Sequence, residues 1–248
     1  MTSAASQART ALEELLRDAP ELAASLPVGY GDAVEHYVAL LLGANQRLNL
    51  TRVVQPEAVA RLHLLDALAA LPLIDSWAPH SVIDLGSGGG VPGIPLALAR
   101  PGTHWTLVDS VGKKASALRE MVEGLGLDNV AVLGSRAESL GRDPRHREQH
   151  DLVTARACAT LPVLVELALP LVRRGGHLLA WKGPLTEDDE EMRRGRTALG
   201  EVGGGSPRLL DPGLAGLGGH RFVVATKDRA TADRFPRRSG EPNRRPLG

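Results

Sequence analysis

The sequence is most informative at Val82-Ile83-Asp84-Leu85-Gly86-Ser87-Gly88-Gly89-Gly90-Val91-Pro92-Gly93. A short apolar run ends in an acid, a glycine-rich loop follows, and a helix is predicted at its end. A second apolar run, Leu107-Val108, ends in Asp109, 23 residues after Gly86. This order predicts the first half of a nucleotide-binding α/β sheet. The glycines let a ligand approach the backbone, and Asp109 is placed to accept both ribose hydroxyls.

The chemistry around this glycine loop favours S-adenosylmethionine (SAM) over a dinucleotide. A pyrophosphate needs free amides at a helix N-terminus, but Pro92 and Pro95 occupy the start of the predicted helix and Pro92 has no N–H. Asp84 would also repel a pyrophosphate, whereas an acid there suits the sulfonium and amino groups of SAM. The alternative is a glycine turn that binds nothing, against which the second acid, Asp109, argues.

Composition predicts a cytoplasmic protein with one α/β domain and an extension. The chain has 248 residues, 43% of them hydrophobic, and no apolar run approaches the roughly 20 residues that cross a bilayer. The acidic first 25 residues do not read as a signal peptide. The single cysteine, Cys158, excludes an internal disulfide, and we expect it to be a small core residue. No His/Asp/Glu cluster has metal-ligand spacing. His63 and Asp66, at i and i+3 of a predicted helix, are expected to hydrogen-bond the glycine loop, with metal binding as the alternative.

Charge is unevenly distributed, although the formal net charge is zero. Residues 221–248 hold eight basic against three acidic side chains, whereas residues 1–30 hold two arginines against four acids. Arginine outnumbers lysine 25 to 4, and arginine binds phosphates and stacks on bases better than lysine. Because genomic composition also explains an arginine-rich chain, charge alone does not identify a nucleic-acid-binding protein.

The pattern of apolar residues predicts a helical cap over residues 1–72 and an α/β domain over residues 73–248, packed as one compact unit. Helices are expected at 7–18, 31–43 and 56–71 in the cap, with a polar, helix-poor segment at 45–52, and at 92–100, 112–124, 160–173 and 186–200 afterwards. Parallel strands are expected at 81–85, 104–109, 129–133, 151–155 and 176–181, followed by an antiparallel pair near 207–210 and 220–227. This is the seven-stranded, mostly parallel sheet of a Rossmann-like class I SAM-dependent methyltransferase. Residues 141–150 read as a charged surface loop.

Ligands of such a sheet bind beyond the carboxyl ends of its strands. The backbone of Ala137 or the carboxylate of Glu138 is placed to bond an adenine edge, unless Glu138 caps a short helix. Arg156 directly follows the fourth strand and needs acceptors there. A cofactor carboxylate and a guanine edge both supply them; the alternative is an ion pair with Asp84 or another core acid. Lys182, after the fifth strand, has the same two interpretations.

The segment after the fourth strand, Thr154 to Ala159, lacks the Asn/Asp/Ser-Pro-Pro-aromatic motif of enzymes that methylate exocyclic amino groups. Cys158 lacks the Pro-Cys context of pyrimidine carbon-5 methyltransferases. An arginine-rich site without an evident base fits a nucleophile that carries no proton, such as guanine N7. Transfer then needs in-line alignment at about 3 Å rather than acid–base chemistry.

Several motifs in one order resemble the RsmG/GidB family, the bacterial 16S rRNA guanine-N7 methyltransferases. The resemblance spans residues 38–248. Its motifs are Asn45-x-x-x-Asn49-Leu50-Thr51, His63-x-x-Asp66-Ala67-Leu68, the glycine loop through Ala97, Leu107-Val-Asp-Ser110 with Lys113-Lys114, Arg136-Ala-Glu138, Arg156-Ala157, Lys182-Gly183 and Pro236-Arg-Arg-x-Gly-x-Pro242. Departures are Gly89 and Val91 in the loop, Glu241 before the tail proline, and a longer loop at 141–150.

The resemblance implies methyl transfer from SAM to N7 of a guanine in the decoding-region loop of 16S rRNA, with the rRNA or the small ribosomal subunit as partner. With the local chemistry, it predicts a cofactor site at Asp84, Gly86, Ser87, Gly88, Val91, Asp109, Ala137, Glu138 and Arg156, and catalytic roles for Arg156 and Lys182. It predicts RNA phosphate contacts at Arg234, Arg237, Arg238, Arg244 and Arg245, extended by Lys113, Lys114 and Arg119. We expect a monomer without metal or membrane. The alternatives are a SAM-dependent small-molecule methyltransferase and a non-catalytic nucleotide-binding module.

Overall fold

The computed structural model describes residues 2–248, and its strands form one seven-stranded sheet in the order β3-β2-β1-β4-β5-β7-β6. The strands are β1 Ser81–Leu85, β2 His104–Val108, β3 Val130–Leu133, β4 His150–Arg156, β5 Val172–Lys182, β6 Arg208–Leu210 and β7 Arg221–Thr226. The pairs β1–β4, β2–β3 and β4–β5 are parallel, whereas β7 runs antiparallel to both β5 and β6. The predicted seven-stranded, mostly parallel sheet with an antiparallel final pair is confirmed.

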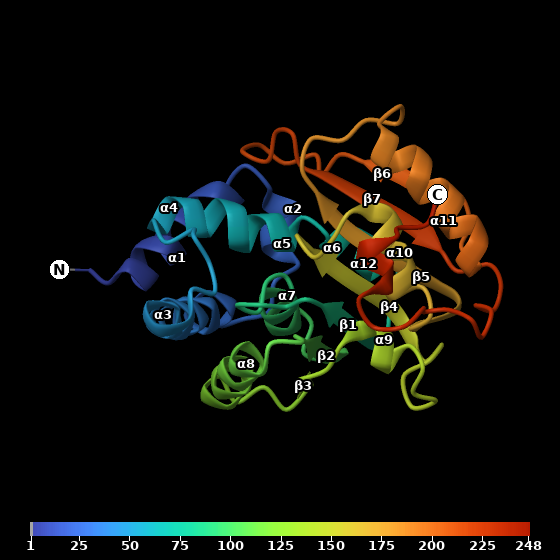
Figure 1. Ribbon diagram of the computed structural model, residues 1–248. Coiled ribbons are helices and arrows are strands. Elements are labelled where there is room, and N and C mark those ends of the chain that lie inside the picture. Colours follow the sequence, from blue (N-terminus) through green and yellow to red (C-terminus); the bar gives the residue numbers. More distant parts are fainter. Residues whose placement is uncertain (1) are drawn as a thin grey trace. The chain divides into compact units, whose positions relative to one another are not determined.

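The helices precede and alternate with these strands (Figure 1). They are α1 Ala4–Leu16, α2 Pro20–Ala24, α3 Tyr30–Leu48, α4 Pro56–Val59, the π-helix η1 Ala60–Leu65, α5 Asp66–Leu68, α6 Leu71–Trp77, α7 Gly93–Ala99, α8 Gly112–Gly124, α9 Ala137–Leu140, α10 Leu161–Ala168, α11 Glu190–Val202 and α12 Glu241–Arg244. The α/β alternation expected after Pro79 is therefore present.

The chain divides into two compact units. The first comprises the residues up to His80, Ser87–Gly134 and Pro212–Gly218; the second comprises Ser81–Gly86, Ser135–Asp211 and Gly219–Gly248. The chain passes between the units within the glycine loop, so each unit supplies part of the predicted site residues. The division into a cap over 1–72 and a domain over 73–248 stays a prediction.

The first unit is built around α1 and α3, which pack together through an apolar stripe on each helix. Ala8 and Leu12 of α1 and Tyr37 and Leu41 of α3 are almost completely buried, at the spacing of one helix face. The predicted helix-poor segment, 45–52, was wrong in its first half, because α3 continues to Leu48 and ends where the backbone of Asn49 turns left-handed. The polar side chains of that last turn are tolerated since they lie on the exposed face. Residues 49–52 are non-helical, as predicted.

The predicted helix over residues 56–71 is divided into three segments. A six-residue π-helix, η1, lies between α4 and α5, and α6 starts anew at Leu71. Apolar periodicity does not distinguish a π turn from an α turn, because both bury one face. Buried His63 belongs to η1, and its Nε2 lies 2.8 Å from the Thr51 hydroxyl.

The second unit contains a core in which β4 and β5 are covered by apolar side chains on both faces. Leu152, Val153, Leu178 and Leu179 are fully buried, the pattern of central strands in a parallel sheet. Helices α10 and α11 pack against each other in the same unit (Figure 1). This core fixes the carboxyl ends of β4 and β5, where two predicted site residues lie.

The segment 141–150 is more than a charged surface loop. The guanidinium of Arg147 donates hydrogen bonds to the carbonyl oxygens of Gly141, Thr231 and Phe235 at 2.7 to 2.8 Å. His150 begins β4 and is buried. The expected charged loop is present as a series of turns, and one of its charges, Arg147, also binds backbone carbonyls of the C-terminal segment.

Candidate functional site

In the first unit, the glycine loop is fastened to the end of β2 through Ser87 and Asp109. The backbone N–H of Ser87 donates to the carbonyl of Val108, and the Ser87 hydroxyl accepts from the Val108 N–H. The Asp109 carboxylate accepts from the N–H of Gly88 at 3.1 Å and from that of Val111 at 2.8 Å. Asp109 is 6% exposed, so the loop is hydrogen-bonded to a nearly buried acid.

This arrangement fits the cofactor favoured by the sequence. The Gly88 amide is bonded to a carboxylate, which would repel a pyrophosphate approaching the same amide. Each oxygen of Asp109 takes one backbone hydrogen bond and keeps acceptor capacity. That capacity matches the hydroxyl groups of a ribose, which are donors. The Asp109 carboxylate, as an acceptor, therefore suits an uncharged ribose better than a phosphate.

Helix α3 supports the same loop from within the first unit. The Tyr37 hydroxyl donates to the carbonyl of Gly89 at 2.8 Å. A Cβ on Gly89 would lie 2.7 Å from Leu41 Cδ1, so only glycine permits this close approach. Val91, half-buried, follows, and α7 begins at Gly93, as the two prolines predicted. The loop is thus held by a strand end and by a helix of the predicted cap.

In the second unit, Asp84 of β1 is completely buried and accepts a hydrogen bond from the Thr154 hydroxyl of β4 at 2.7 Å. The two residues are partners in the parallel register. Arg156 ends β4 and is half-buried, and the backbone of Ala157 after it has a φ of 52°. An L-residue in this left-handed conformation is strained, which turns the chain sharply away from the strand beyond Arg156.

Lys182 ends β5 and forms an ion pair. An ion pair was the second of the two interpretations that the sequence allowed for this residue. Its ammonium donates to Glu191 Oε1 of α11 at 2.7 Å and to the carbonyl of Ala159 at 2.8 Å. The same Glu191 oxygen accepts from the N–H of Leu161. Lys182 thus tethers the turn that follows Arg156, and its catalytic role stays a prediction.

Glu138 lies in the first turn of α9 and is 6% exposed, with Ala137 half-buried before it. Its Oε1 accepts from the backbone N–H of Gly240, 2.8 Å away and 102 residues later. The start of α9 has no side-chain cap, so the capping alternative for Glu138 does not apply. The Gly240 bond uses only Oε1, so both the carboxylate and the backbone of Glu138 keep capacity for an adenine contact.

Cys158 is exposed, and the expectation of a core cysteine was wrong. A Cβ on Gly86, whose φ is +72°, would lie 3.0 Å from the Cys158 sulfur. The thiol therefore lies against the first glycine of the loop. No signal in the sequence indicated the left-handed turn that brings the thiol out.

The predicted phosphate-contacting residues differ in accessibility. Arg237 binds Glu166, a fully buried residue of α10, through Nε and Nη2 and also through its backbone N–H. A phosphate contact would compete with this pair, so the predicted phosphate contact of Arg237 stays a prediction that its pairing with Glu166 disfavours. The exposed members are Lys113, Arg119, Arg234, Arg238, Arg244 and Arg245, and Lys114 is half-buried.

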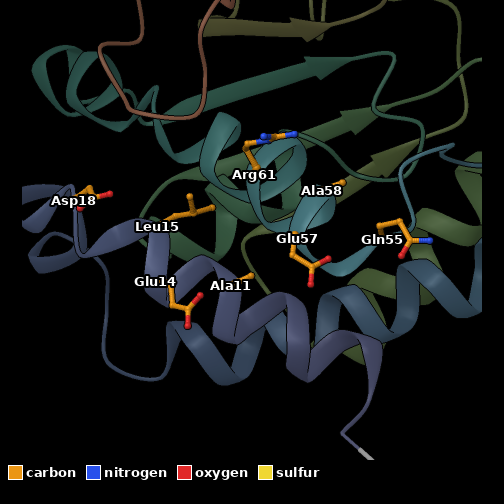
Figure 2. Close-up of a pocket in the computed structure, with 8 residues that line it drawn as sticks. All are labelled: Ala11, Glu14, Leu15, Asp18, Gln55, Glu57, Ala58 and Arg61. Carbon is orange, nitrogen blue, oxygen red and sulfur yellow. The ribbon is translucent and has the colours of Figure 1, made fainter.

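A separate surface pocket of about 550 Å³ lies in the first unit between α1 and the segment α4–η1 (Figure 2). Its rim carries Glu14, Asp18 and Glu57, with Arg61 as the basic member. None of the predicted site residues lines it. Three carboxylates make it unfavourable for RNA phosphates.

Neither a metal centre nor a membrane span is found in residues 2–248. No three His, Cys, Asp or Glu side chains within that range are grouped so that they could hold a metal ion. Over the same range, every helix is too short or too polar to span a membrane.

Comparisons with known proteins agree with one another. Residues 31–202 match the family described as rRNA small subunit methyltransferase G (GidB). The chain is 42% identical over 241 residues to the ribosomal RNA small subunit methyltransferase G of Deinococcus deserti, covering 96% of each protein. It is 45% identical over 213 residues to that of a Roseiflexus species (strain RS-1), covering 85% of this chain and 89% of the other.

Among solved structures, the chain is similar to an O-methyltransferase from Bacillus cereus crystallised with SAH. The TM-score is 0.55 and the identity 20%, over 77% of this chain and 90% of the other. At that identity the similarity establishes the shared fold.

Proposed function

The chain belongs to the rRNA small subunit methyltransferase G family, and we propose that it transfers a methyl group from SAM to N7 of a guanine in the decoding-region loop of 16S rRNA. The observation that carries the proposal is the match to the family over residues 31–202, together with a relative that is 42% identical over 96% of the chain. The acid-bonded glycine loop supports SAM as cofactor, since Asp109 holds the Gly88 amide and leaves acceptor capacity for ribose hydroxyls.

SAM would supply an electrophilic methyl group, and the residues around it need only bind and orient. We assign ribose binding to Asp109 and adenine contact to the backbone of Ala137 and Glu138. Asp84 is the anionic partner of the cofactor's cationic groups, and Arg156 donates hydrogen bonds to substrate or cofactor. The cofactor approaches the backbone at Gly86, Ser87, Gly88 and Val91. Arg156 supplies up to five N–H donors in one plane, which suits the O6 edge of guanine or a carboxylate.

Guanine N7 needs no general base, because its lone pair carries no proton. The protein's contribution is then alignment and exclusion of water. The buried Asp84 and the tethered turn at Lys182 supply fixed surroundings for Arg156. This division of labour accounts for a site in which arginine and backbone groups predominate.

We further propose that the protein acts as a monomer in the cytoplasm, on 16S rRNA or on the small subunit, and that residues 1–72 form its cap. The proposal is tested with labelled SAM and small-subunit particles that lack the modification. Label should appear in 16S rRNA and not in the ribosomal proteins. SAM binding without any labelled rRNA would favour a small-molecule methyltransferase instead.

A further inference from the structure

The C-terminal segment after β7, residues 229–245 and called the strap here, is held by side chains outside it. Glu148 accepts from the backbone N–H of Thr231 at 2.8 Å and pairs with buried Lys227 at the same distance. Arg147 donates to the carbonyls of Thr231 and Phe235. The first part of the strap is therefore fixed through its backbone.

A buried ion pair fixes the middle of the strap. Glu166 is completely buried on α10, and both of its oxygens accept from the Arg237 guanidinium. The paired carboxylate raises the pKa of Arg237 above its usual range. Arg237 Nη2 also donates to the carbonyl of Arg245 at 2.8 Å. One arginine thus joins the core to two points of the strap.

Glu138 holds the strap at a further point, the backbone N–H of Gly240. The 2.8 Å hydrogen bond from the Gly240 N–H ends on a carboxylate that is almost completely buried, and charge-assisted bonds of this kind are stronger than neutral ones. Gly240 has a φ of +79° and directly precedes α12. The bond therefore fixes the backbone where α12, which contains Arg244, begins.

Five arginines of the strap are exposed while the backbone beneath them is held. One of them, Arg229, donates to the carbonyl of Gly200, which leaves four for a ligand. The Arg234 guanidinium lies over the Phe235 ring at 4.8 Å, and Arg238, Arg244 and Arg245 are exposed. Arg244 and Arg245, with Glu241, line a hollow of about 260 Å³. Guanidinium groups bind phosphate oxygens in a fixed fork, and a backbone ordered beforehand loses less entropy on binding.

We propose that Glu138 and Glu166 are positioning residues that hold the strap as a preordered surface for RNA phosphates, contacted by Arg234, Arg238, Arg244 and Arg245. The inference deepens the proposed function and rests on it for the identity of the RNA. It assigns the acids of α9 and α10 to RNA binding, although neither carboxylate faces the RNA. Helix α9 also contains Ala137 and Glu138, whose backbone is assigned to the adenine.

The Glu138 bond is tested by comparing Glu138→Ala with Glu138→Gln. The amide oxygen of glutamine can still accept from Gly240, whereas alanine cannot. We expect Glu138→Ala to raise the Kd for a 16S rRNA fragment, measured by filter binding, and the KM for particles by about tenfold. Glu138→Gln should stay close to wild type in both. Calorimetric SAM affinity should change far less than RNA affinity in either variant.

Two other outcomes would contradict the positioning role of Glu138. Loss of SAM affinity in Glu138→Ala with unchanged RNA binding would make the carboxylate an adenine ligand. Unchanged RNA and SAM binding in Glu138→Ala would show that Glu138 does not position the strap. Because RNA binding is measured without methyl transfer, a wild-type protein that binds the fragment but transfers nothing would refute the proposed function and leave the strap intact.

The arginines proposed to bind RNA are tested with the triple variant Arg238→Ala/Arg244→Ala/Arg245→Ala and with Arg17→Ala, just after α1, as a control. The triple variant should bind the fragment more weakly. Its dependence of log Kd on log salt should be shallower by about 0.7 for each phosphate that is no longer neutralised. Arg17→Ala should match wild type. An unchanged salt dependence in the triple variant would contradict the proposal.

Discussion

The carboxylate of Asp109 accepts a hydrogen bond from the backbone N–H of Gly88 at 3.1 Å. A conventional phosphate-binding loop leaves such an amide for its anionic ligand, whereas here the amide already has an anionic partner. This one bond separates the cofactor classes more clearly than the glycine pattern does.

Replacing Asp109 tests that relationship. Asp109→Ala removes the proposed ribose acceptor and the partner of the Gly88 amide. Hydrogen bonds to charged groups contribute about 1.5–3 kcal/mol, so we expect SAM affinity by calorimetry to fall about 10- to 100-fold. The melting temperature should fall comparatively little. Unchanged SAM affinity would contradict the ribose role.

Arg156→Ala separates binding from reaction at the end of β4. We expect methyl transfer to be lost while the circular dichroism spectrum and melting temperature stay near wild type, because Arg156 is only half-buried. Turnover close to wild type would remove Arg156 from the site. Arg174→Ala, at an exposed arginine of β5, is the matched control and should retain full activity.

Lys182 is expected to act through Glu191. Lys182→Met leaves that carboxylate without its cation and frees the turn at Ala159, so we expect a stability loss of about 1–3 kcal/mol and a lower kcat. In a double-mutant cycle with Glu191→Gln, the two stability losses should be strongly non-additive. Loss of all transfer with unchanged stability would instead restore a direct catalytic role for Lys182.

Cys158 provides a chemical probe of the glycine loop. It is the single cysteine, it is exposed, and its sulfur lies against Gly86. Bound SAM should therefore slow alkylation by iodoacetamide, followed by intact mass, and alkylated protein should bind SAM more weakly. Cys158→Ser serves as the unlabelled control. Equal alkylation rates with and without saturating SAM would separate this turn from the cofactor.

Stability should fall in mild acid because of His150. Burial, reinforced by His146, lowers the pKa of His150 to about 4, below the value of about 6.5 for an unfolded chain. The unfolded state then binds the proton first, so this contribution is present above pH 6.5 and is lost as the pH falls toward 4. The slope approaches about 1.4 kcal/mol per pH unit. Urea titrations of wild type and His150→Gln should differ in that window, and parallel profiles would refute it.

The sheet could be predicted because each strand carries its own signal. Apolar runs end in Asp84 or Asp109, and helical periodicity separates them, so parallel strands with helical crossovers could be predicted. The antiparallel final pair was equally visible, because no helix fits between β6 and β7. Local chemistry at the glycine loop also indicated the class of cofactor.

Other features depend on contacts that sequence spacing does not encode. Arg237 looked like one more basic residue of the tail until Glu166, 71 residues away, proved to be its partner. The left-handed Ala157 exposes Cys158, and a non-glycine residue does not indicate such a turn in advance. Long-range pairing and local strain are tertiary properties, and they decided which charged residues remain accessible.

The most direct test of the proposed function locates the transferred methyl group. After reaction of labelled SAM with unmodified small-subunit particles, the 16S rRNA is digested to nucleosides, and a second sample is cleaved selectively at 7-methylguanosine. The proposal predicts label in 7-methylguanosine alone and one cleavage within the decoding-region loop. Label in another nucleoside, or cleavage elsewhere in the rRNA, would contradict it.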